Sequence, residues 1–232
     1  MTIDQVLVVV PAHNEAVDLP HCIDALLEAT RRIDVPVRIV TVLDSCSDRS
    51  SEVIPSGIDV IRAQHHNVGK SRATGFSTFG TDSRTAFAST WFATTDADSV
   101  VGPTWLARQL EYAQSADVVA GTVRIADWDD QPSSVQQLYE QRYHAHPIGR
   151  HGHIHGANLG IRADKYWSVG GFSHLEEGED VDLVRRLSED GARIAWAQDI
   201  AVTTSARTDG RTPGGFAGHI RELGTETVDV AR

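Results

Sequence analysis

The stretch VLVVVPAHNE, residues 6–15, decides the fold class. Residues 6–10 are apolar and mostly β-branched, which is typical of a strand buried on both faces of a parallel sheet. The chain then changes to Pro11, Ala12, His13, Asn14 and Glu15. In an open parallel sheet the ligand crevice lies beyond the carboxyl ends of the strands, so these residues stand where a ligand would bind. The run lacks the GxGxxG pattern of a dinucleotide site, and a turn in which Asn14 caps the next helix is the alternative explanation.

Strands and helices alternate along the rest of the chain. Apolar spacing predicts helices at residues 15–32, 47–54, 68–79, 103–114, 133–143 and 179–189. Strands are expected at residues 6–10, 37–43, 58–61, 91–95 and 118–125, with two short strands at 193–196 and 200–204. This alternation predicts an α/β protein with a mainly parallel central sheet and helices on both faces.

Length, charge, hydropathy and cysteine content exclude several classes of protein. The 232 residues suit one domain, and the formal net charge of −11 disfavours nucleic-acid binding because phosphate backbones are repelled. No apolar run reaches the ~18 residues of a membrane span, and the start lacks the pattern of a signal peptide. The two cysteines, Cys22 and Cys46, fit no metal spacing and suit reduced thiols. We therefore expect a cytoplasmic protein without an integral membrane segment.

Polar motifs follow the second and third predicted strands. DSCSD (residues 44–48) places Asp44 at a strand end, where its carboxylate can accept hydrogen bonds from a nucleobase or a ribose hydroxyl. NVGKSRATG (residues 67–75) places Lys70 and Arg72 at a helix start, which suits a diphosphate or a base edge. The alternatives are an ordinary helix cap and a solvated helix start.

TDADS (residues 95–99) ends the fourth predicted strand. Asp96 and Asp98 are two residues apart, so in extended chain both project on one side. Paired carboxylates suit Mg²⁺ or Mn²⁺, which take their other ligands from phosphates and water. An exposed Asx turn is the alternative explanation.

EEGEDVD (residues 176–182) opens the last predicted helix with five carboxylates in seven positions. Attraction of acidic groups to the positive end of the helix dipole explains part of this pattern. The functional interpretation is that one carboxylate acts as a general base toward an acceptor hydroxyl.

The order of the motifs carries more information than any one of them. PAHNEA, DSCSD, NVGKSRATG, TDADS, GANLGIRADKYWSVGGF and EGEDVDLVRRL follow one another in this sequence. This order resembles the nucleotide-sugar glycosyltransferases of family 2, over about residues 5–207. The resemblance implies a GT-A, Rossmann-like fold with a small acceptor-side subregion. It also implies inversion at the anomeric carbon.

The resemblance implies donor contacts for a series of residues. Those that line the nucleotide are Pro11, Ala12, Asn14 and Glu15. Asp44 meets the base, and near the base or phosphates lie Asn67, Lys70 and Arg72. Near the ribose or the metal lie Asp96 and Ala97, and beside the donor sugar lie Gly156, Ala157 and Asn158.

The same resemblance implies the catalytic groups. Asp98, together with Asp96, ligates the Mg²⁺ or Mn²⁺ that bridges the donor diphosphate. Asp180 deprotonates the acceptor and Glu179 supports the site. The donor is UDP-, GDP- or dTDP-linked. A single domain at residues 1–207 divides into a nucleotide-sugar half, 1–100, and an acceptor half, 101–207, followed by a polar tail at 208–232.

Two departures limit what is implied. The Q/RxxRW motif and the transmembrane helices of the membrane synthases are missing from this sequence, which favours a single transfer over processive synthesis. Alternatives are a nucleotidyltransferase and a catalytically silent nucleotide-sugar-binding protein of the same fold. The acceptor and the base stay open, and a homo-oligomer is allowed.

Five histidines gather before the GANLG segment: His144, His146, His151, His153 and His155. Without a Cys or an HxxxH spacing, a polar loop over the acceptor cleft is favoured over a zinc site. His155 directly precedes the GANLG segment, so it is a candidate for the neighbourhood of the diphosphate.

Overall fold

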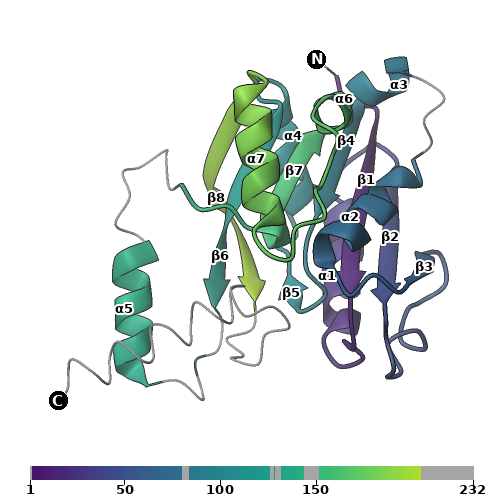
Figure 1. Cartoon of the computed structure of the whole chain (residues 1–232), viewed down its shortest axis with the longest axis vertical. Coiled ribbons are helices and arrows are strands. Elements are labelled where there is room, and N and C mark those ends of the chain that lie inside the picture. Colours follow the sequence, from purple (N-terminus) through teal and green to yellow (C-terminus); the bar gives the residue numbers. More distant parts are fainter. Residues whose placement is uncertain (1, 80–83, 126–127, 129–131, 144–151, 205–232) are drawn as a thin grey trace.

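The protein is described by a computed structural model that covers residues 2–79, 84–125, 128, 132–143 and 152–204 (Figure 1). The predicted C-terminal tail at 208–232 lies outside these residues. The strands are β1 (Gln5–Ala12), β2 (Val37–Asp44), β3 (Asp59–Ala63), β4 (Thr90–Thr94), β5 (Ser99–Val100), β6 (Val118–Ile125), β7 (Leu159–Arg162) and β8 (Ile194–Thr204). The helices are α1 (Leu19–Thr30), α2 (Val68–Ser77), α3 (Arg84–Ala88), α4 (Trp105–Ala113), α5 (Ser133–Tyr143), α6 (Ala163–Ser168) and α7 (Glu179–Glu189).

The strands form one eight-stranded sheet in the order β3-β2-β1-β4-β7-β6-β8-β5. The pairs β3–β2, β2–β1, β1–β4 and β6–β8 are parallel, whereas β7 runs antiparallel to both of its neighbours and β5 runs antiparallel to β8. The mixed α/β architecture is therefore confirmed. Because β1, β2, β3 and β4 run in the same direction, the motifs that follow them meet at one edge of the sheet.

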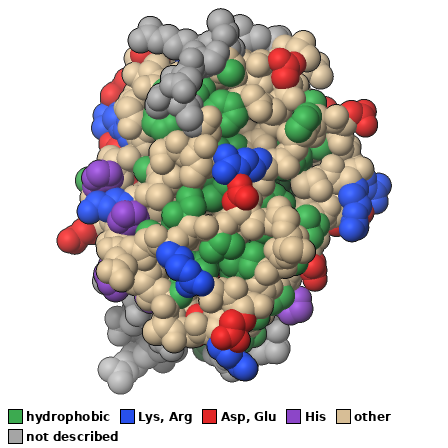
Figure 2. All heavy atoms as spheres, turned by 90° about the vertical axis from the view of Figure 1, so that its right-hand side faces the viewer, with side chains coloured by type: hydrophobic (Ala, Val, Ile, Leu, Met, Phe, Trp, Pro, Cys, Tyr) green, Lys and Arg blue, Asp and Glu red, His purple; other side chains and the backbone are tan. Residues whose placement is uncertain are grey.

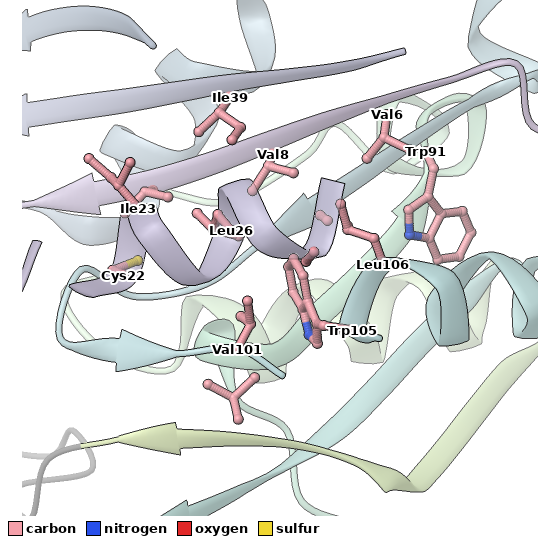
Figure 3. Packing of buried hydrophobic residues seen from close by; sticks show 14 of the residues in the cluster. Val6, Val8, Cys22, Ile23, Leu26, Ile39, Trp91, Val101, Trp105 and Leu106 are labelled. Atoms are coloured by element: carbon pink, nitrogen blue, oxygen red, sulfur yellow. The ribbon is translucent and has the colours of Figure 1, made fainter. Parts of the chain in front are cut away.

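The period of two along β1 builds a core on each face of the sheet. Val6, Val8 and Val10 pack under α1 and α4, where Figure 3 shows Ile23 and Leu26 on α1 and Trp105 and Leu106 on α4. Leu7 and Val9 point the other way, into a second core with α2, α6 and α7. Figure 1 shows α2 and α7 in front of the sheet. Helices therefore cover both faces, as the sequence predicts.

Several predicted boundaries need correction. Residues 47–54 form turns and not a helix, because polar side chains take up the backbone groups: Asp48 accepts from the Ser50 N–H (2.9 Å) and Asn14 accepts from the Ser47 N–H (2.8 Å). The two short strands predicted at 193–196 and 200–204 are one strand, β8, which follows β6 past an irregularity at Gly121/Thr122.

Five short elements were not predicted: α3, β5, the 3₁₀ helix η1 (Gly156–Asn158), β7 and α6. Strand β7 has only four residues, so its pattern is too short to be distinguished from a loop. Its position between β4 and β6 is fixed by the pairing of Phe92 with Ile161 on one side and of Val119 with Gly160 on the other.

Strand β3 is the edge strand of the parallel half. Figure 2 shows the face of the molecule on this side, where hydrophobic patches are interrupted by single charged side chains. Arg38 and Asp59 form an exposed ion pair here (2.6 Å). Such charges on an edge strand oppose pairing with another chain.

Candidate active site

Three loops follow the carboxyl ends of β1, β2 and β3, and each holds a non-glycine residue in the left-handed backbone region. These residues are Asn14 (φ 55°), Ser45 (φ 56°) and His66 (φ 48°). Such conformations are costly and persist where surrounding contacts fix them, most often at ligand sites. The backbone conformations at this edge of the sheet are therefore typical of a ligand-binding site.

Asp44 organises this edge. Its Oδ1 accepts from the backbone N–H groups of His65 (2.6 Å) and His66 (3.0 Å), and its Oδ2 accepts from the Asn67 N–H (3.0 Å) and the Ser71 hydroxyl (2.9 Å). Burial raises the pKa of this carboxyl, but the hydrogen bonds outweigh burial and lower its pKa to about 2. Asp44 is 5% exposed, so its carboxylate is committed to shaping the loop that precedes α2.

The first motif ties the loops after β1 and β2 together. Asn14 is exposed, and its Oδ1 accepts from the backbone of Ser47 (2.8 Å) and Asp48 (3.3 Å). The Glu15 side chain is buried, and its backbone N–H donates to Ser50 Oγ (2.8 Å). Pro11 and Ala12 are buried at the end of β1. The buried residues of the motif therefore lie beneath this edge of the sheet, and Asn14 lies at its surface.

The start of α2 presents a cation. Asn67 caps the helix by accepting from the Lys70 N–H (2.8 Å), and its Nδ2 donates to the Leu175 carbonyl (2.7 Å). The half-buried Lys70 makes no ion pair with any described residue. A cation at a helix N-terminus favours an anion.

Arg72, two residues after Lys70 on α2, has a different environment. It is 3% exposed, and its guanidinium pairs with Asp96 (Nη2 to Oδ1, 2.6 Å) and with Glu179. Its Cζ lies 5.6 Å from the centroid of the Phe172 ring. Burial lowers the pKa of Arg72, but the two carboxylates outweigh burial and raise it. Arg72 is therefore a buried junction between two acidic segments.

Asp96 and Asp98 follow β4, and both are partly exposed. The neighbouring Cys22 thiol donates to the Asp96 carbonyl (3.4 Å); burial raises the pKa of this thiol, and the charges of Asp96, Asp98 and Glu15 raise it further. Among the described residues no group of three or more His, Cys, Asp or Glu side chains is arranged to hold a metal ion. Two hard carboxylate oxygens nevertheless fit Mg²⁺ or Mn²⁺ where a substrate diphosphate and water complete the shell.

Helix α7 begins beside Arg72. Its first residue, Glu179, is 6% exposed, and burial raises its pKa although the charge of Arg72 opposes this. The partly exposed Asp180 accepts from the Gly156 N–H through Oδ2 (2.7 Å) and from the Val181 N–H through Oδ1 (2.8 Å). The predicted base is thus oriented by backbone amides beside the buried junction.

The residues of the GAN segment (156–158) differ in their surroundings. Gly156 has no room for a side chain, since a Cβ there would lie 2.4 Å from the Arg72 guanidinium carbon. Asn158 is wholly buried: its Oδ1 accepts from Trp105 Nε1 (2.8 Å), and its Nδ2 donates to the carbonyls of Thr122 and Ile200 (both 2.8 Å). Asn158 therefore holds β6 and β8 to α4 through all of these contacts, and the structure gives it no access to a ligand.

Of the histidine cluster, His144, His146 and His151 lie outside the described residues. The His153 ring stacks on Tyr143 (centroids 4.0 Å apart), and His155 Nε2 lies 3.0 Å from the Tyr143 hydroxyl. The described pair thus packs on α5.

The structure brings Asp44, Lys70, Arg72, Asp96, Asp98, Gly156, Glu179 and Asp180 to one edge of the sheet. Sequence reasoning gave no role to Phe172, which packs beneath Arg72. Its position in the GGF segment was the available signal.

A comparison with known families decides the class. Residues 7–170, well over half of the chain, match the sequence profile described as Glycosyl transferase family 2. The chain belongs to glycosyltransferase family 2. The resemblance read from the order of the motifs is thereby confirmed.

Two curated relatives of this family 2 chain are named undecaprenyl-phosphate 4-deoxy-4-formamido-L-arabinose transferase. They come from Pectobacterium carotovorum subsp. carotovorum and from Pectobacterium atrosepticum. Each is 32% identical over 130 residues, which cover 53% of this chain and 37% of the relative. The chain therefore spans well under half the length of these relatives.

Solved structures share the fold. Staphylococcus aureus TarS in complex with UDP superposes with a TM-score of 0.62 at 15% identity, over 94% of this chain and 64% of that chain. The mannosyltransferase PcManGT of Pyrobaculum calidifontis, in complex with GDP-Man and Mn²⁺, gives a TM-score of 0.65 at 17% identity, over 89% and 58%. The family 2 chain thus has a GT-A-type fold. No helix in its described part is both long and apolar enough to cross a bilayer.

Proposed function

We propose that this chain transfers one sugar from a nucleotide-sugar donor to a hydroxyl acceptor, with inversion at the anomeric carbon and with a divalent metal. The observation that carries the proposal is the meeting of two acidic segments at one buried cation. Arg72 pairs with Asp96 after β4 and with Glu179 at the start of α7. A carboxylate pair suited to a metal and a carboxylate suited to proton transfer thus share one site.

The donor side follows from the loops after β1, β2 and β3. Asp44 orders the turn that carries Asn67 to the start of α2, and Lys70 offers its charge to a phosphate. The relatives of known structure support a nucleotide-sugar donor, since TarS binds UDP and UDP-GlcNAc and PcManGT binds GDP-Man. We assign donor binding to residues 1–100 and acceptor binding to residues 101–207.

Asp98, with Asp96, is the proposed holder of Mg²⁺ or Mn²⁺. Such a metal, when bound, supplies Lewis-acid stabilisation of the leaving diphosphate. PcManGT contains Mn²⁺, which supports this choice of ion. The charges of Asp96, Asp98 and Glu15 all raise the pKa of the Cys22 thiol, and negative charge of this kind attracts a cation.

Asp180 is the proposed general base. Its carboxylate receives the acceptor proton while the acceptor oxygen attacks the anomeric carbon opposite the leaving diphosphate, which inverts that carbon. The amides of Gly156 and Val181 hold the carboxylate in one orientation. Glu179 supports the site through Arg72.

The acceptor is not carried over from the curated relatives, which share only part of their length with this chain. Leu175 and Val181, on either side of the acidic pair in sequence, are 44% and 50% exposed. A polyprenyl phosphate therefore belongs in the acceptor panel beside sugars and small metabolites.

The two free thiols suit a reducing compartment, which supports a cytoplasmic site of action.

The deciding experiment is a thermal-shift panel of UDP-, GDP- and dTDP-linked sugars, each with and without Mn²⁺. A ligand at 100 times its Kd stabilises the fold by about 2.7 kcal/mol, which is easily detected. A shift with one nucleotide, enhanced by Mn²⁺ and followed by release of the nucleoside diphosphate on adding an acceptor, is the expected result. Binding without release under every condition would favour the catalytically silent alternative, and no shift at all would contradict the proposed donor class.

A further inference from the structure

Arg72 stands between the donor side and the base side of the site. We infer that Arg72 is a positioning residue, which couples the carboxylate pair after β4 to the proposed base on α7 without itself binding the donor. This inference rests on the proposed function for the roles of Asp96 and Asp180. It replaces the direct contact with base or phosphates that the family resemblance implies.

The burial of Arg72 carries the first step. The side chain is 3% exposed, and each terminal nitrogen is bonded to a carboxylate, one from Asp96 and one from Glu179. Its Nε is buried without a hydrogen-bond partner among the described residues. At 3% exposure the guanidinium presents almost no surface to a diphosphate, whereas the half-buried Lys70 makes no ion pair with any described residue.

The ion pairs carry the second step. Asp96 and Glu179 belong to segments that are far apart in the sequence, the loop after β4 and the first turn of α7. Each carboxylate is fixed by the same planar group, so a movement of one segment displaces the other. Asp96 keeps about a third of its side chain exposed, so it is oriented by Arg72 and still accessible to a ligand.

The third observation is that Gly156 lies between Arg72 and Asp180. Its Cα lies so close to the guanidinium that a Cβ would stand 2.4 Å from Cζ, and its N–H donates to Asp180 Oδ2 (2.7 Å). The guanidinium therefore forms the surface on which the Gly156 amide rests, and that amide orients the base. Arg72 thus reaches both Asp96 directly and Asp180 through one backbone group.

The chain contains a matched control. Arg162 on β7 is also buried, at 7% exposure, and also pairs with two carboxylates, Asp117 and Asp164. These residues lie at the opposite end of β7 from Gly156, where β6 begins and β7 ends. Arg72→Lys and Arg162→Lys each remove a guanidinium that bridges two carboxylates, since a lysine keeps the charge but not the planar fork.

The test compares wild type, R72K, R162K and E179Q by three measurements. These are thermal stability, donor-nucleotide Kd in the presence of Mn²⁺, and the kcat for release of nucleoside diphosphate. We expect R72K and R162K to lower Tm by similar amounts, and R72K to lower kcat at least 30-fold while the donor Kd changes less than 5-fold. E179Q keeps Arg72 but loses one of its ion pairs, so it should show a smaller fall in kcat; it serves as the test if R72K does not fold. R162K should stay within 3-fold of wild type.

Two outcomes would overturn the inference. If R72K loses no more kcat than R162K, Arg72 only stabilises the fold. If R72K weakens donor binding more than 10-fold while kcat at saturation is kept, Arg72 is a donor ligand, as the family resemblance implies.

Amide hydrogen exchange separates this inference from the proposed function. R72K, but not R162K, should exchange faster than wild type in peptides containing residues 156–158 and 179–182. This readout requires no substrate. A wild-type protein that transfers no sugar would contradict the proposed function, and the exchange experiment would still test whether Arg72 couples the two segments. Unchanged exchange in R72K would overturn the coupling whatever the activity.

Discussion

The backbone amide of Gly156 donates a hydrogen bond to Asp180 Oδ2 over 2.7 Å. This contact joins the turn before β7 to the first turn of α7, two segments that sequence motifs place separately. It leaves Asp180 partly exposed and with one fixed orientation, which is what a general base requires.

Replacing Asp180 should therefore affect turnover more than binding. For Asp180→Asn we expect the nucleotide-sugar Kd to stay near that of wild type and kcat to fall by about 100-fold or more, the usual contribution of a positioned base. Steady-state kinetics with calorimetric donor titration checks this. Asp182→Asn is the matched control, because Asp182 lies on the same helix but is held by Ser173, Arg185 and Arg186. Near-normal turnover in D180N would require another base.

Replacing Asp98 should remove the dependence of donor binding on metal. For Asp98→Ala we expect Mn²⁺ to give no added thermal shift with the nucleotide, and for wild type we expect a chelator to stop turnover. Asp59→Ala removes a carboxylate at the amino end of β3, far from the site edge, and should keep the Mn²⁺ effect. Full wild-type activity in chelator would contradict metal dependence.

Asp44 should make stability depend on pH in the acid range. Its pKa is lowered to about 2 in the folded protein, below the ordinary value of 3.8, so the folded state binds fewer protons than the unfolded state around pH 3. The stabilisation from Asp44 is therefore complete above about pH 5 and is lost as the pH falls toward 2.

The variant Asp44→Asn tests this dependence. It should be destabilised by about 2 kcal/mol at pH 7, since an amide cannot accept all of the N–H and O–H donors that the carboxylate holds. Urea unfolding at pH 7, 5, 4 and 3 measures the difference between wild type and variant. We expect that difference to be constant from pH 7 to 5 and to shrink below pH 4. A difference that does not shrink would contradict the low pKa.

Asn158 should act on stability. Asn158→Ala leaves Trp105 Nε1 and two carbonyls without their buried partner, so we expect a loss of about 2–4 kcal/mol of unfolding free energy. Chemical denaturation measures this, with Gln137→Ala on the exposed side of α5 as the control. If N158A kept wild-type stability but weakened sugar binding, the sugar contact implied by the family resemblance would be restored.

The two thiols should differ in reactivity. Burial and the charges of Asp96, Asp98 and Glu15 raise the pKa of Cys22, so almost no thiolate forms at pH 8. We expect iodoacetamide to modify the half-buried Cys46 in the native protein and Cys22 only after unfolding, as read by peptide mass spectrometry. Cys46 contacts Ala12 and Asn14, so nucleotide should slow its modification. Equal labelling of both thiols would show that Cys22 is accessible.

The sequence by itself determined the alternation of strands and helices, because buried strands and amphipathic helices leave different local periods. It also determined the candidate acids at the strand ends, since polar residues after apolar runs mark the edge of a parallel sheet. Boundaries failed where side chains replaced backbone hydrogen bonds, as Asn14 and Asp48 do over residues 47–54. The antiparallel β7 was missed because four residues carry too little pattern.

Only the tertiary structure decided what several of the polar residues do. A spacing of residues along the chain does not show that Arg72 lies buried between Asp96 and Glu179, or that Asn158 is buried on Trp105. Both facts depend on which surfaces pack against each other over long stretches of chain. A buried charge or amide takes the partners that packing brings within hydrogen-bond distance, since leaving it unpaired is costly, and those partners are specified only when the sheet and its helices have come together.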